Sequence, residues 1–346
     1  MNRKRYRVAQ WATGDSGMQC LRAIIGHPWL DLVALRVYSD TKAGRDAGDL
    51  CGLAPTGVIA TQDVEEIIAA RPDCVSYMPG YAEIDVLCRL LEAGCNIVTA
   101  RTEFNCREAI VPEVRSKLEA ACARGQASLY CTGSTPGWFT EQLPLALSLL
   151  QRRIDCITLT DYADMSDYDS PQMIFDILPF GADPVKLADA VTAGTTKIAP
   201  GSLLMTATAL GLRIDEFVTH NDIALARNRV EIAAGVVEAG TVGAFSRSIS
   251  GLRHGEPVIR RVSILYVTSD VAPDWNLRPS GQLMRIDGDT PLEVSFVNPV
   301  PAGEKQHGSS GLTANPVVNA IPYICAAPPG IVETAELPVM MGWFGD

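Results

Sequence analysis

Glu103 is the residue whose type and position point most directly to chemistry. It follows an apolar segment, Asn96 to Ala100, that predicts a buried strand, and it lies in the sequence Arg101-Thr102-Glu103. Ligands of open α/β sheets bind beyond the carboxyl ends of the strands. A poorly solvated carboxylate there could hold an ammonium or iminium group, or act as a general base with a raised pKa. In the alternative interpretation, Glu103 caps the helix that starts near Arg107 or pairs with Arg101.

A glycine turn near the N-terminus predicts a second chemical site. The segment Tyr6 to Ala12 predicts a strand, Ala12-x-Gly14-x-x-Gly17 a turn, and Met18 to Ile25 a helix. Such a turn directs unpaired N–H groups and the helix dipole at a dinucleotide pyrophosphate. The match is weakened because Ala12 replaces the first glycine of the fingerprint.

The turn and the start of its helix are expected to contact the cofactor. The residues concerned are Thr13, Gly14, Asp15, Ser16, Gly17 and Met18. The carboxylate of Asp15 would repel a pyrophosphate if it pointed inward. We therefore expect Asp15 to act as the N-cap, with its side chain turned onto helix N–H groups.

The residues after the second predicted strand, Leu32 to Tyr38, indicate the form of the cofactor. An acid about 20 residues past the last glycine would hold the ribose hydroxyls of NAD. Ser39 is found there, followed by Lys42 and Arg45, and a hydroxyl with two cations suits the 2′-phosphate of NADP. NADP is therefore favoured. NAD is the alternative, in which Asp40 serves as the acid and the two cations are solvated loop charges.

Strands and helices alternate over the first part of the chain and would position these residues. After the second strand, strand segments are expected at Val58 to Ala60, Cys74 to Met78, Asn96 to Ala100 and Ala127 to Cys131, and helices at Gln62 to Ala70, Glu83 to Ala93 and Ala109 to Arg124. This alternation predicts βαβ units and a parallel sheet with helices on both faces. The predicted fold class is α/β, with an N-terminal Rossmann domain.

The pattern changes after Gly133. A helix is expected at Phe139 to Gln151, a strand at Ile154 to Tyr162 and a helical region at Pro171 to Leu210. Strands with tight turns are then expected at Ile214 to Thr219, Arg229 to Val237, Gly243 to Ser250, Val258 to Thr268, Gln282 to Ile286 and Leu292 to Val297. These segments predict an α+β domain with a mixed sheet, a type of surface that often forms dimers.

The apolar C-terminal segment is expected to return to the first domain. Leu312 to Cys325 predicts a helix despite Pro316 and Pro322. The predicted domains are therefore a dinucleotide-binding domain, residues 1–135 with 308–346, and a substrate and dimerisation domain, residues 136–307.

Composition excludes several classes of partner. The chain has 346 residues, 47% of them hydrophobic, and a formal net charge of −11, which argues against a nucleic-acid partner. No apolar run approaches a membrane span, and residues 1–30 lack a signal peptide, so we expect a cytoplasmic protein. The ten cysteines form no CxxC pair and no cluster of zinc spacing, so no metal site is expected.

Two stretches are candidates for binding a substrate. Trp138 and Phe139 follow a Pro-Gly turn and could wall an apolar pocket or belong to the core. The acidic stretch Asp161 to Asp169 could line a polar pocket for an amine, or it could be a solvated loop.

The chain as a whole resembles the dihydrodipicolinate reductase-like superfamily, in its branch of native amine dehydrogenases and 2,4-diaminopentanoate dehydrogenases. The resemblance covers most of the chain. It is carried by Gln10-Trp11-Ala12-Thr13-Gly14 with Gly17, Tyr38-Ser39 followed by Lys42-Ala43-Gly44-Arg45-Asp46-Ala47-Gly48, Thr102-Glu103-Phe104, Gly133-Ser134-Thr135-Pro136-Gly137-Trp138-Phe139, Tyr168-Asp169-Ser170-Pro171, and Val318-Asn319-Ala320-Ile321-Pro322 with Ala327-Pro328-Pro329-Gly330-Ile331.

The resemblance implies a Rossmann domain completed by the C-terminal segment, a homodimer, and NAD(P)-linked chemistry at carbon–nitrogen bonds. In amine dehydrogenases, a glutamate matching Glu103 holds ammonia and the developing iminium, to which hydride passes from the nicotinamide. Further site residues implied in this way are Pro79, Thr102 and Asn319 for the cofactor, and Thr135, Trp138, Phe139 and Tyr168 for the substrate. Thr135 stands where many relatives have asparagine.

The chain departs from true dihydrodipicolinate reductases. It has no adjacent histidines, and Lys186-Leu187-Ala188-Asp189-Ala190-Val191 lacks the Pro-Ser-Gly-Thr that follows in those enzymes. The favoured function is amination of a small ketone or aldehyde with ammonia. A diaminopentanoate dehydrogenase or imine reductase is the alternative, and a diamino-acid substrate would need a cation such as Arg152, Arg153 or an arginine of residues 227–261. A non-enzymatic nucleotide-sensing module is the third interpretation.

Overall fold

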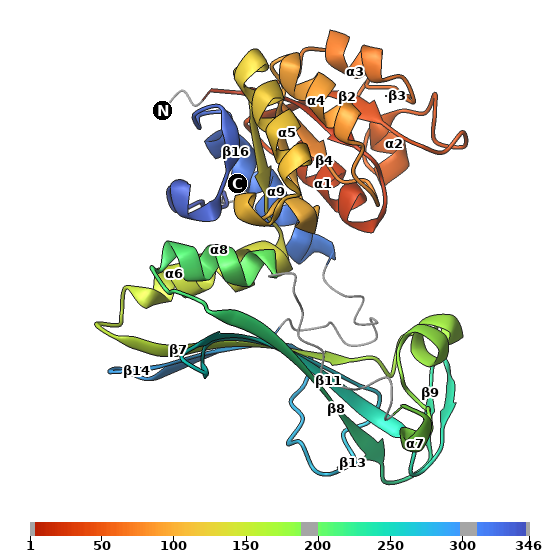
Figure 1. The fold of residues 1–346 in the computed structure, drawn as a ribbon. Helices are drawn as coiled ribbons and strands as arrows, with labels where there is room; N and C mark the ends of the chain where they lie inside the picture. Colours follow the sequence, from red (N-terminus) through yellow and green to blue (C-terminus); the bar gives the residue numbers. More distant parts are fainter. Residues whose placement is uncertain (1–3, 188–199, 298–309, 344–346) are drawn as a thin grey trace. The chain divides into compact units, whose positions relative to one another are not determined.

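A computed structural model describes residues 4–187, 200–297 and 310–343 (Figure 1). The chain divides into two compact units, residues 1–143 with 308–346, and residues 144–307. The division falls at Leu143, beyond the predicted limit at residue 135, because the segment after Gly133 contacts the C-terminal elements of the first unit.

The first unit contains a seven-stranded sheet whose order is β16-β6-β5-β4-β1-β2-β3. Every neighbouring pair is parallel. The strands are β1 (Tyr6–Trp11), β2 (Leu30–Arg36), β3 (Ala60–Thr61), β4 (Cys74–Tyr77), β5 (Asn96–Thr99), β6 (Ser128–Cys131) and β16 (Gly330–Val332). The helices are α1 (Asp15–Gly26), α2 (Ala47–Cys51), α3 (Val64–Ala69), α4 (Ile84–Glu92), α5 (Pro112–Gly125) and α9 (Ser310–Ile324), with short 3₁₀ turns η1 (Thr102–Phe104), η2 (Arg107–Ala109) and η5 (Thr334–Glu336).

Helices cover both faces of this sheet, because successive strand residues point to opposite sides. Trp11 of β1 packs in a cluster with residues of α4 and α5, whereas Val8 packs in a cluster with residues of α1 and α9. The C-terminal segment therefore supplies a helix, α9, and an edge strand, β16, to the first unit. The predicted fold class, a Rossmann domain completed by the C-terminus, is confirmed.

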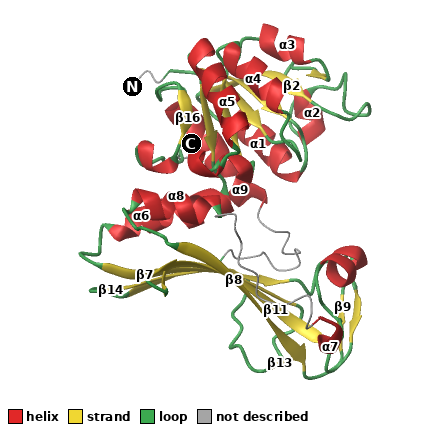
Figure 2. Cartoon of the chain, viewed as in Figure 1, coloured by secondary structure: helices red, strands yellow, loops and turns green. Residues whose placement is uncertain are grey.

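The second unit contains a seven-stranded mixed sheet of order β13-β8-β11-β12-β7-β14-β15 (Figure 2). β12 pairs with β7 in parallel, and the other pairs are antiparallel. The strands are β7 (Ile154–Asp164), β8 (Glu216–Ala226), β11 (Val242–Arg253), β12 (Glu256–Tyr266), β13 (Val271–Ala272), β14 (Gly281–Gly288) and β15 (Leu292–Phe296), with a separate hairpin of β9 (Val230–Ile232) and β10 (Gly235–Val237).

Two predicted helices differ from the structure. The expected helix Phe139 to Gln151 is an irregular helical segment, η3 (Ser134–Gln142), interrupted by non-helical backbone at residues 135–137, and then α6 (Leu143–Ser148). The Thr-Pro-Gly sequence causes this interruption, because proline and glycine break helices. The region Pro171 to Leu210 forms short pieces, η4 (Gln172–Ile177), α7 (Pro184–Leu187) and α8 (Gly201–Ala209), and residues 188–199 lie outside the described part.

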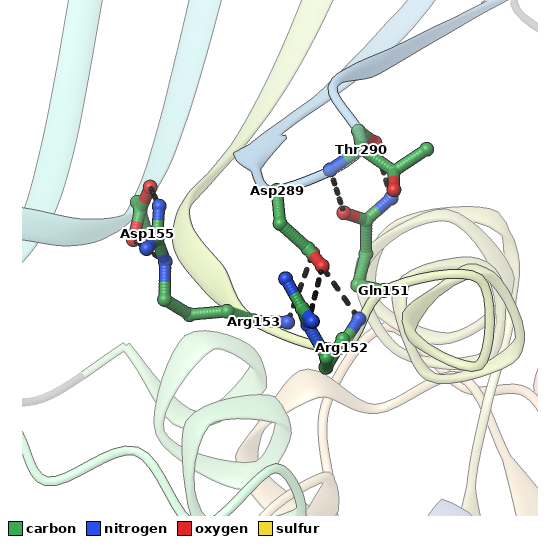
Figure 3. A network of polar contacts seen from close by, with 6 residues as sticks. All are labelled: Gln151, Arg152, Arg153, Asp155, Asp289 and Thr290. Atoms are coloured by element: carbon green, nitrogen blue, oxygen red, sulfur yellow. Dashed lines mark hydrogen bonds and ion pairs between the residues drawn. The ribbon is translucent and has the colours of Figure 1, made fainter.

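A polar network in the second unit joins the residues before β7 to the turn after β14 (Figure 3). Asp289, in the turn after β14, accepts hydrogen bonds from the backbone N–H groups of Arg152 and Arg153, at 3.2 and 3.0 Å. Its other oxygen accepts from Arg152 Nε at 3.1 Å, and Arg153 pairs with Asp155. Both arginines therefore hold the start of β7 against this turn.

No helix among the described residues is long and apolar enough to cross a membrane.

Candidate active site

The glycine turn has the form required for binding phosphate. Helix α1 begins at Asp15, its N-cap is Gly14, and no side chain caps it. The prediction that Asp15 is the N-cap is therefore wrong, because the helix starts one residue earlier than expected and Asp15 is its first residue. The absence of a side-chain cap leaves the first N–H groups of α1 for phosphate oxygens.

Two details of this turn follow from its tight geometry. A Cβ atom added to Gly17 would lie 2.4 Å from the carbonyl oxygen of Ala12, so only glycine fits there. Ala12 itself has a φ of 70°, in the left-handed region that favours glycine. The buried side chain of Gln10 donates hydrogen bonds to the carbonyls of Ala12 and Trp11, at 2.8 and 3.3 Å. Gln10, which sequence reasoning did not place in the site, thus supports the turn.

Lys42 reaches the glycine turn from the loop after β2. Its ammonium donates to the carbonyl oxygen of Thr13 at 2.9 Å and to the Thr13 hydroxyl at 3.0 Å. Ser39 lies in the same loop, where its hydroxyl contacts that of Thr41 at 2.7 Å, and Arg45 is exposed. The structure therefore brings Lys42 to the turn, whereas Ser39 and Arg45 lie in the same loop and, among the described residues, form no hydrogen bond with the turn.

Asp40, the alternative acid, accepts a hydrogen bond from Gln62 Nε2 at 3.1 Å. The same amide group also donates to the carbonyl of Tyr38 at 2.8 Å. Gln62 thus holds the Asp40 side chain against the loop backbone.

Tyr38 stands beside this loop in a fixed orientation that sequence reasoning missed. Its hydroxyl accepts from Trp11 Nε1 at 3.1 Å and donates to Glu83 at 2.6 Å. The guanidinium of Arg36 lies 4.0 Å from the Tyr38 ring centroid and 5.3 Å from that of Trp11. Burial and the bond to Glu83 raise the pKa of Tyr38, so it stays a neutral phenol. These contacts fix the Tyr38 ring, which precedes Ser39 in the sequence.

Glu103 lies in η1, just beyond the carboxyl end of β5. Both hydrogen bonds from the Arg101 guanidinium, at 2.8 and 3.0 Å, end on its Oε1 atom. The side chain is 40% exposed. The expected poor solvation is therefore not found within this chain, and the pairing with Arg101, one of the two alternatives, is present. Arg101 does not occupy Oε2, so this oxygen can bind a further cation.

The backbone around Glu103 is held from several sides. Arg101 also donates to the carbonyl of Gly80, and its own N–H donates to Thr99 Oγ1 at 3.1 Å. The thiol of Cys131 donates to the Arg101 carbonyl at 3.2 Å. Phe104 is 2% exposed and anchors η1 in the core.

The predicted cofactor residues fall into two groups. The turn of β1, Pro79 after β4, and Thr102 after β5 lie at one edge of the sheet, because β1, β4 and β5 are parallel neighbours. Asn319 does not join them. It lines a pocket with Ala23 and Gly26 at the other end of α1, which as a 12-residue helix spans about 18 Å.

The predicted substrate residues are divided between the two units. Thr135 and Trp138 are half-buried in the irregular segment η3 of the first unit, whereas Phe139 has no exposed surface and belongs to the core. Tyr168 is 44% exposed and belongs to the second unit, after β7. In the acidic stretch, Asp161 pairs with Arg261 at 3.4 Å.

Glu141 is a buried acid that sequence reasoning missed. It has no exposed surface, accepts a hydrogen bond from Asn105 at 3.2 Å, and accepts another from the Thr334 hydroxyl. Burial raises the pKa of Glu141 to about 8. Its position after a Pro-Gly turn gave no signal, because its partners come from distant parts of the chain.

Comparisons with known proteins agree with this geometry. The sequence pattern of the 2,4-diaminopentanoate dehydrogenase C-terminal domain matches residues 140–346. An amine dehydrogenase from Streptomyces virginiae is 32% identical over 347 residues, covering 95% of each chain. The solved amine dehydrogenase of Mycobacterium smegmatis has the same fold, with a TM-score of 0.74 and 22% identity over 98% of this chain and 97% of the other. The resemblance predicted from the sequence is thus confirmed, and the chain belongs to the family of oxidoreductases that comprises amine dehydrogenases and 2,4-diaminopentanoate dehydrogenases.

Proposed function

We propose that this protein is an NAD(P)H-dependent amine dehydrogenase that aminates a small ketone or aldehyde with ammonia and, in reverse, deaminates the amine. The observation that carries the proposal is the position of Glu103, at the same sheet edge as the glycine turn of β1. Membership of the family supports it, because the relative from Streptomyces virginiae is an amine dehydrogenase.

Glu103 is the proposed catalytic residue. Ammonia adds to the carbonyl carbon, and the hydroxyl of the adduct takes up a proton from solvent and leaves as water, which gives an iminium cation. The reduced nicotinamide, when bound, would supply the hydride that completes the neutral amine. Arg101 holds Oε1 of Glu103, so Oε2 accepts an N–H of ammonia and then of the iminium. A carboxylate in this place stabilises the cation electrostatically and orients it for hydride transfer.

We propose that NADP is preferred over NAD. The first turn of α1 holds the pyrophosphate, and Pro79 and Thr102 lie toward the nicotinamide. Lys42, with Ser39 and Arg45 in the same loop, supplies donors and positive charge for a 2′-phosphate. Asp40 is engaged by Gln62 at Oδ1 and remains the alternative acid for ribose hydroxyls.

The test is NADPH oxidation with a series of small aldehydes and ketones, each assayed with and without ammonia. Oxidation that requires both the carbonyl compound and ammonia supports amination. Oxidation that proceeds equally well without ammonia shows simple carbonyl reduction and contradicts the proposal.

A second candidate, 2,4-diaminopentanoate dehydrogenase, is favoured by the family match of residues 140–346. Its substrate carries a carboxylate, which calls for a cation. Arg152 and Arg153 are engaged in the network of Figure 3. Arg247 of β11 is exposed and forms no ion pair with the described residues. Oxidation of 2,4-diaminopentanoate that far exceeds oxidation of simple amines, and that is lost in Arg247→Ala, would select this candidate.

We also propose that the protein is a homodimer formed through the second unit. In the second unit, α8 packs on β12 of the seven-stranded mixed sheet. A mixed sheet of this kind is a type of surface that often forms dimers. Light scattering coupled to size-exclusion chromatography is expected to give twice the chain mass. A single chain mass would contradict this proposal.

A further inference from the structure

Glu141 carries chemistry that the proposed reaction does not yet use. It lies at the end of η3, has no exposed surface, and belongs to the first unit. Each of its oxygens is bonded to a different distant segment. Oε1 accepts from Asn105 Nδ2 at 3.2 Å, and Oε2 accepts from the Thr334 hydroxyl. Glu141 therefore joins three segments that are far apart in sequence.

The bond to Asn105 leads directly to the proposed catalytic turn. Asn105 follows η1, and its N–H donates to the carbonyl of Thr102 at 3.4 Å, which closes the turn that carries Glu103. Asn105 is itself 7% exposed, so water does not readily replace Glu141 as its partner. The turn that carries Glu103 is thus tied to Glu141 by a hydrogen bond that is shielded from solvent.

The bond to Thr334 leads to the C-terminal segment. The Thr334 hydroxyl also contacts the hydroxyl of Tyr130 at 3.1 Å, which fixes η5 beside β6. The titratable groups that face Glu141 are Glu333 on the C-terminal segment, and Tyr130 and Cys131 on β6. None of these is a cation. Burial, with a smaller contribution from Glu333, therefore raises the pKa of Glu141 to about 8, and the group is protonated at neutral pH.

We propose that Glu141 is a positioning residue that holds the Glu103 turn in place through Asn105. The inference rests on the proposed role of Glu103. In its neutral form, Glu141 carries its proton on Oε2 and donates it to the Thr334 hydroxyl, so the direction of that bond is reversed, while Oε1 still accepts the hydrogen bond of Asn105. No uncompensated charge is then buried. When the proton leaves, a buried anion without a cation partner remains, and the structure relieves it by local opening that admits water. Opening there displaces Glu103 and slows the amination step.

Hydrogen–deuterium exchange tests the structural part of the proposal without any need for activity. In Glu141→Ala, amides of residues 102–106 are expected to exchange about tenfold faster than in the wild type. Thr334→Val is the matched control, because it removes the other bond of Glu141 and leaves the Asn105 bond, so exchange at 102–106 stays as in the wild type. Asn105→Ala removes the hydrogen bond between residues 105 and 141 by deleting its donor. This variant is used in place of Glu141→Ala if Glu141→Ala does not fold. Unchanged exchange in a folded variant of either kind overturns the proposal.

The pH profile of Glu141→Gln tests the consequence for catalysis. Glutamine can accept the Asn105 bond and cannot ionise. We divide the ammonia-dependent rate of Glu141→Gln by that of the wild type at each pH. The protonation of ammonia affects both enzymes equally and therefore drops out of this ratio. The ratio is expected to rise severalfold as the pH passes about 8. A ratio that stays constant with pH overturns the role of Glu141. Absence of ammonia-dependent turnover in the wild type at every pH overturns the proposed function instead, and the exchange result still decides whether Glu141 holds the turn.

Discussion

The guanidinium of Arg101 donates two hydrogen bonds to Oε1 of Glu103, at 2.8 and 3.0 Å. The same guanidinium donates to the carbonyl of Gly80, so it ties η1 to the loop after β4. Arg101 therefore fixes which oxygen of Glu103 faces away from the ion pair. The arrangement orients the carboxylate rather than burying it, since the Glu103 side chain is 40% exposed.

Replacing Arg101 is expected to misplace Glu103 without disturbing the cofactor. In Arg101→Met, kcat for ammonia-dependent NADPH oxidation should fall about tenfold, because small errors in orientation are costly in catalysis. The dissociation constant for NADPH, measured by fluorescence titration, should change by less than about twofold. An equal loss in both quantities would show that Arg101 acts on the cofactor instead.

Lys42 is expected to set the preference for NADPH. Lys42→Ala removes the ammonium at Thr13, and the affinity for NADPH should fall about tenfold while that for NADH changes little. Lys117→Ala on α5 is the matched control, since it removes a lysine away from the glycine turn. Equal losses for both nucleotides in Lys42→Ala would contradict a 2′-phosphate contact.

The two glycines of the turn should respond differently to alanine. In Gly17→Ala, the new Cβ would lie 2.4 Å from the Ala12 carbonyl, so both the melting temperature and NADPH binding should fall. Gly14→Ala meets no protein atom within 4 Å, so its melting temperature should match the wild type, and any effect should be confined to cofactor binding. Equal melting temperatures for the two variants would show that the turn adjusts to a side chain at residue 17.

Glu141 should make stability depend on pH. Its pKa is raised from 4.5 to about 8 in the folded chain, so the native state binds a proton that the unfolded state has released. The stabilisation is complete below about pH 4.5 and is lost as pH rises to about 8, with a slope of up to about 1.4 kcal/mol per pH unit. Urea midpoints measured across this range should therefore fall less steeply in Glu141→Gln than in the wild type. Parallel slopes would show that Glu141 is ionised in the folded protein.

Much of the fold follows from local patterns in the sequence. The βαβ alternation predicts the parallel sheet, and helix Leu312 to Cys325 is found as α9, Ser310–Ile324, even with two prolines inside it. The strands of the second unit differ in detail from the prediction. The segment Arg229 to Val237, predicted as one strand, forms the hairpin of β9 and β10. β8, for example, extends to Ala226 rather than Thr219, because pairing with β11 continues past the alternating apolar pattern.

The site was less predictable because it depends on contacts between distant segments. Glu103 and the glycine turn carry local signals, a carboxylate after a strand and glycines before a helix. Glu141 does not, because its environment is made by Asn105 and Thr334. Asn319 was placed with the cofactor through resemblance, yet it lies at the opposite end of α1 from the turn. The start of α1 at Asp15 could not be read from the sequence either, since glycine at the N-cap leaves no side-chain signal.

The central claim is that the Glu103 carboxylate binds ammonia and the iminium, and one substitution tests it most directly. In Glu103→Gln, the affinity for NADPH should stay near that of the wild type, while ammonia-dependent NADPH oxidation should fall by at least about a hundredfold. Glu108→Gln, an exposed glutamate on η2, is the matched control and should keep its activity. Turnover in Glu103→Gln that is close to the wild type, with ammonia still required, would contradict the role assigned to Glu103.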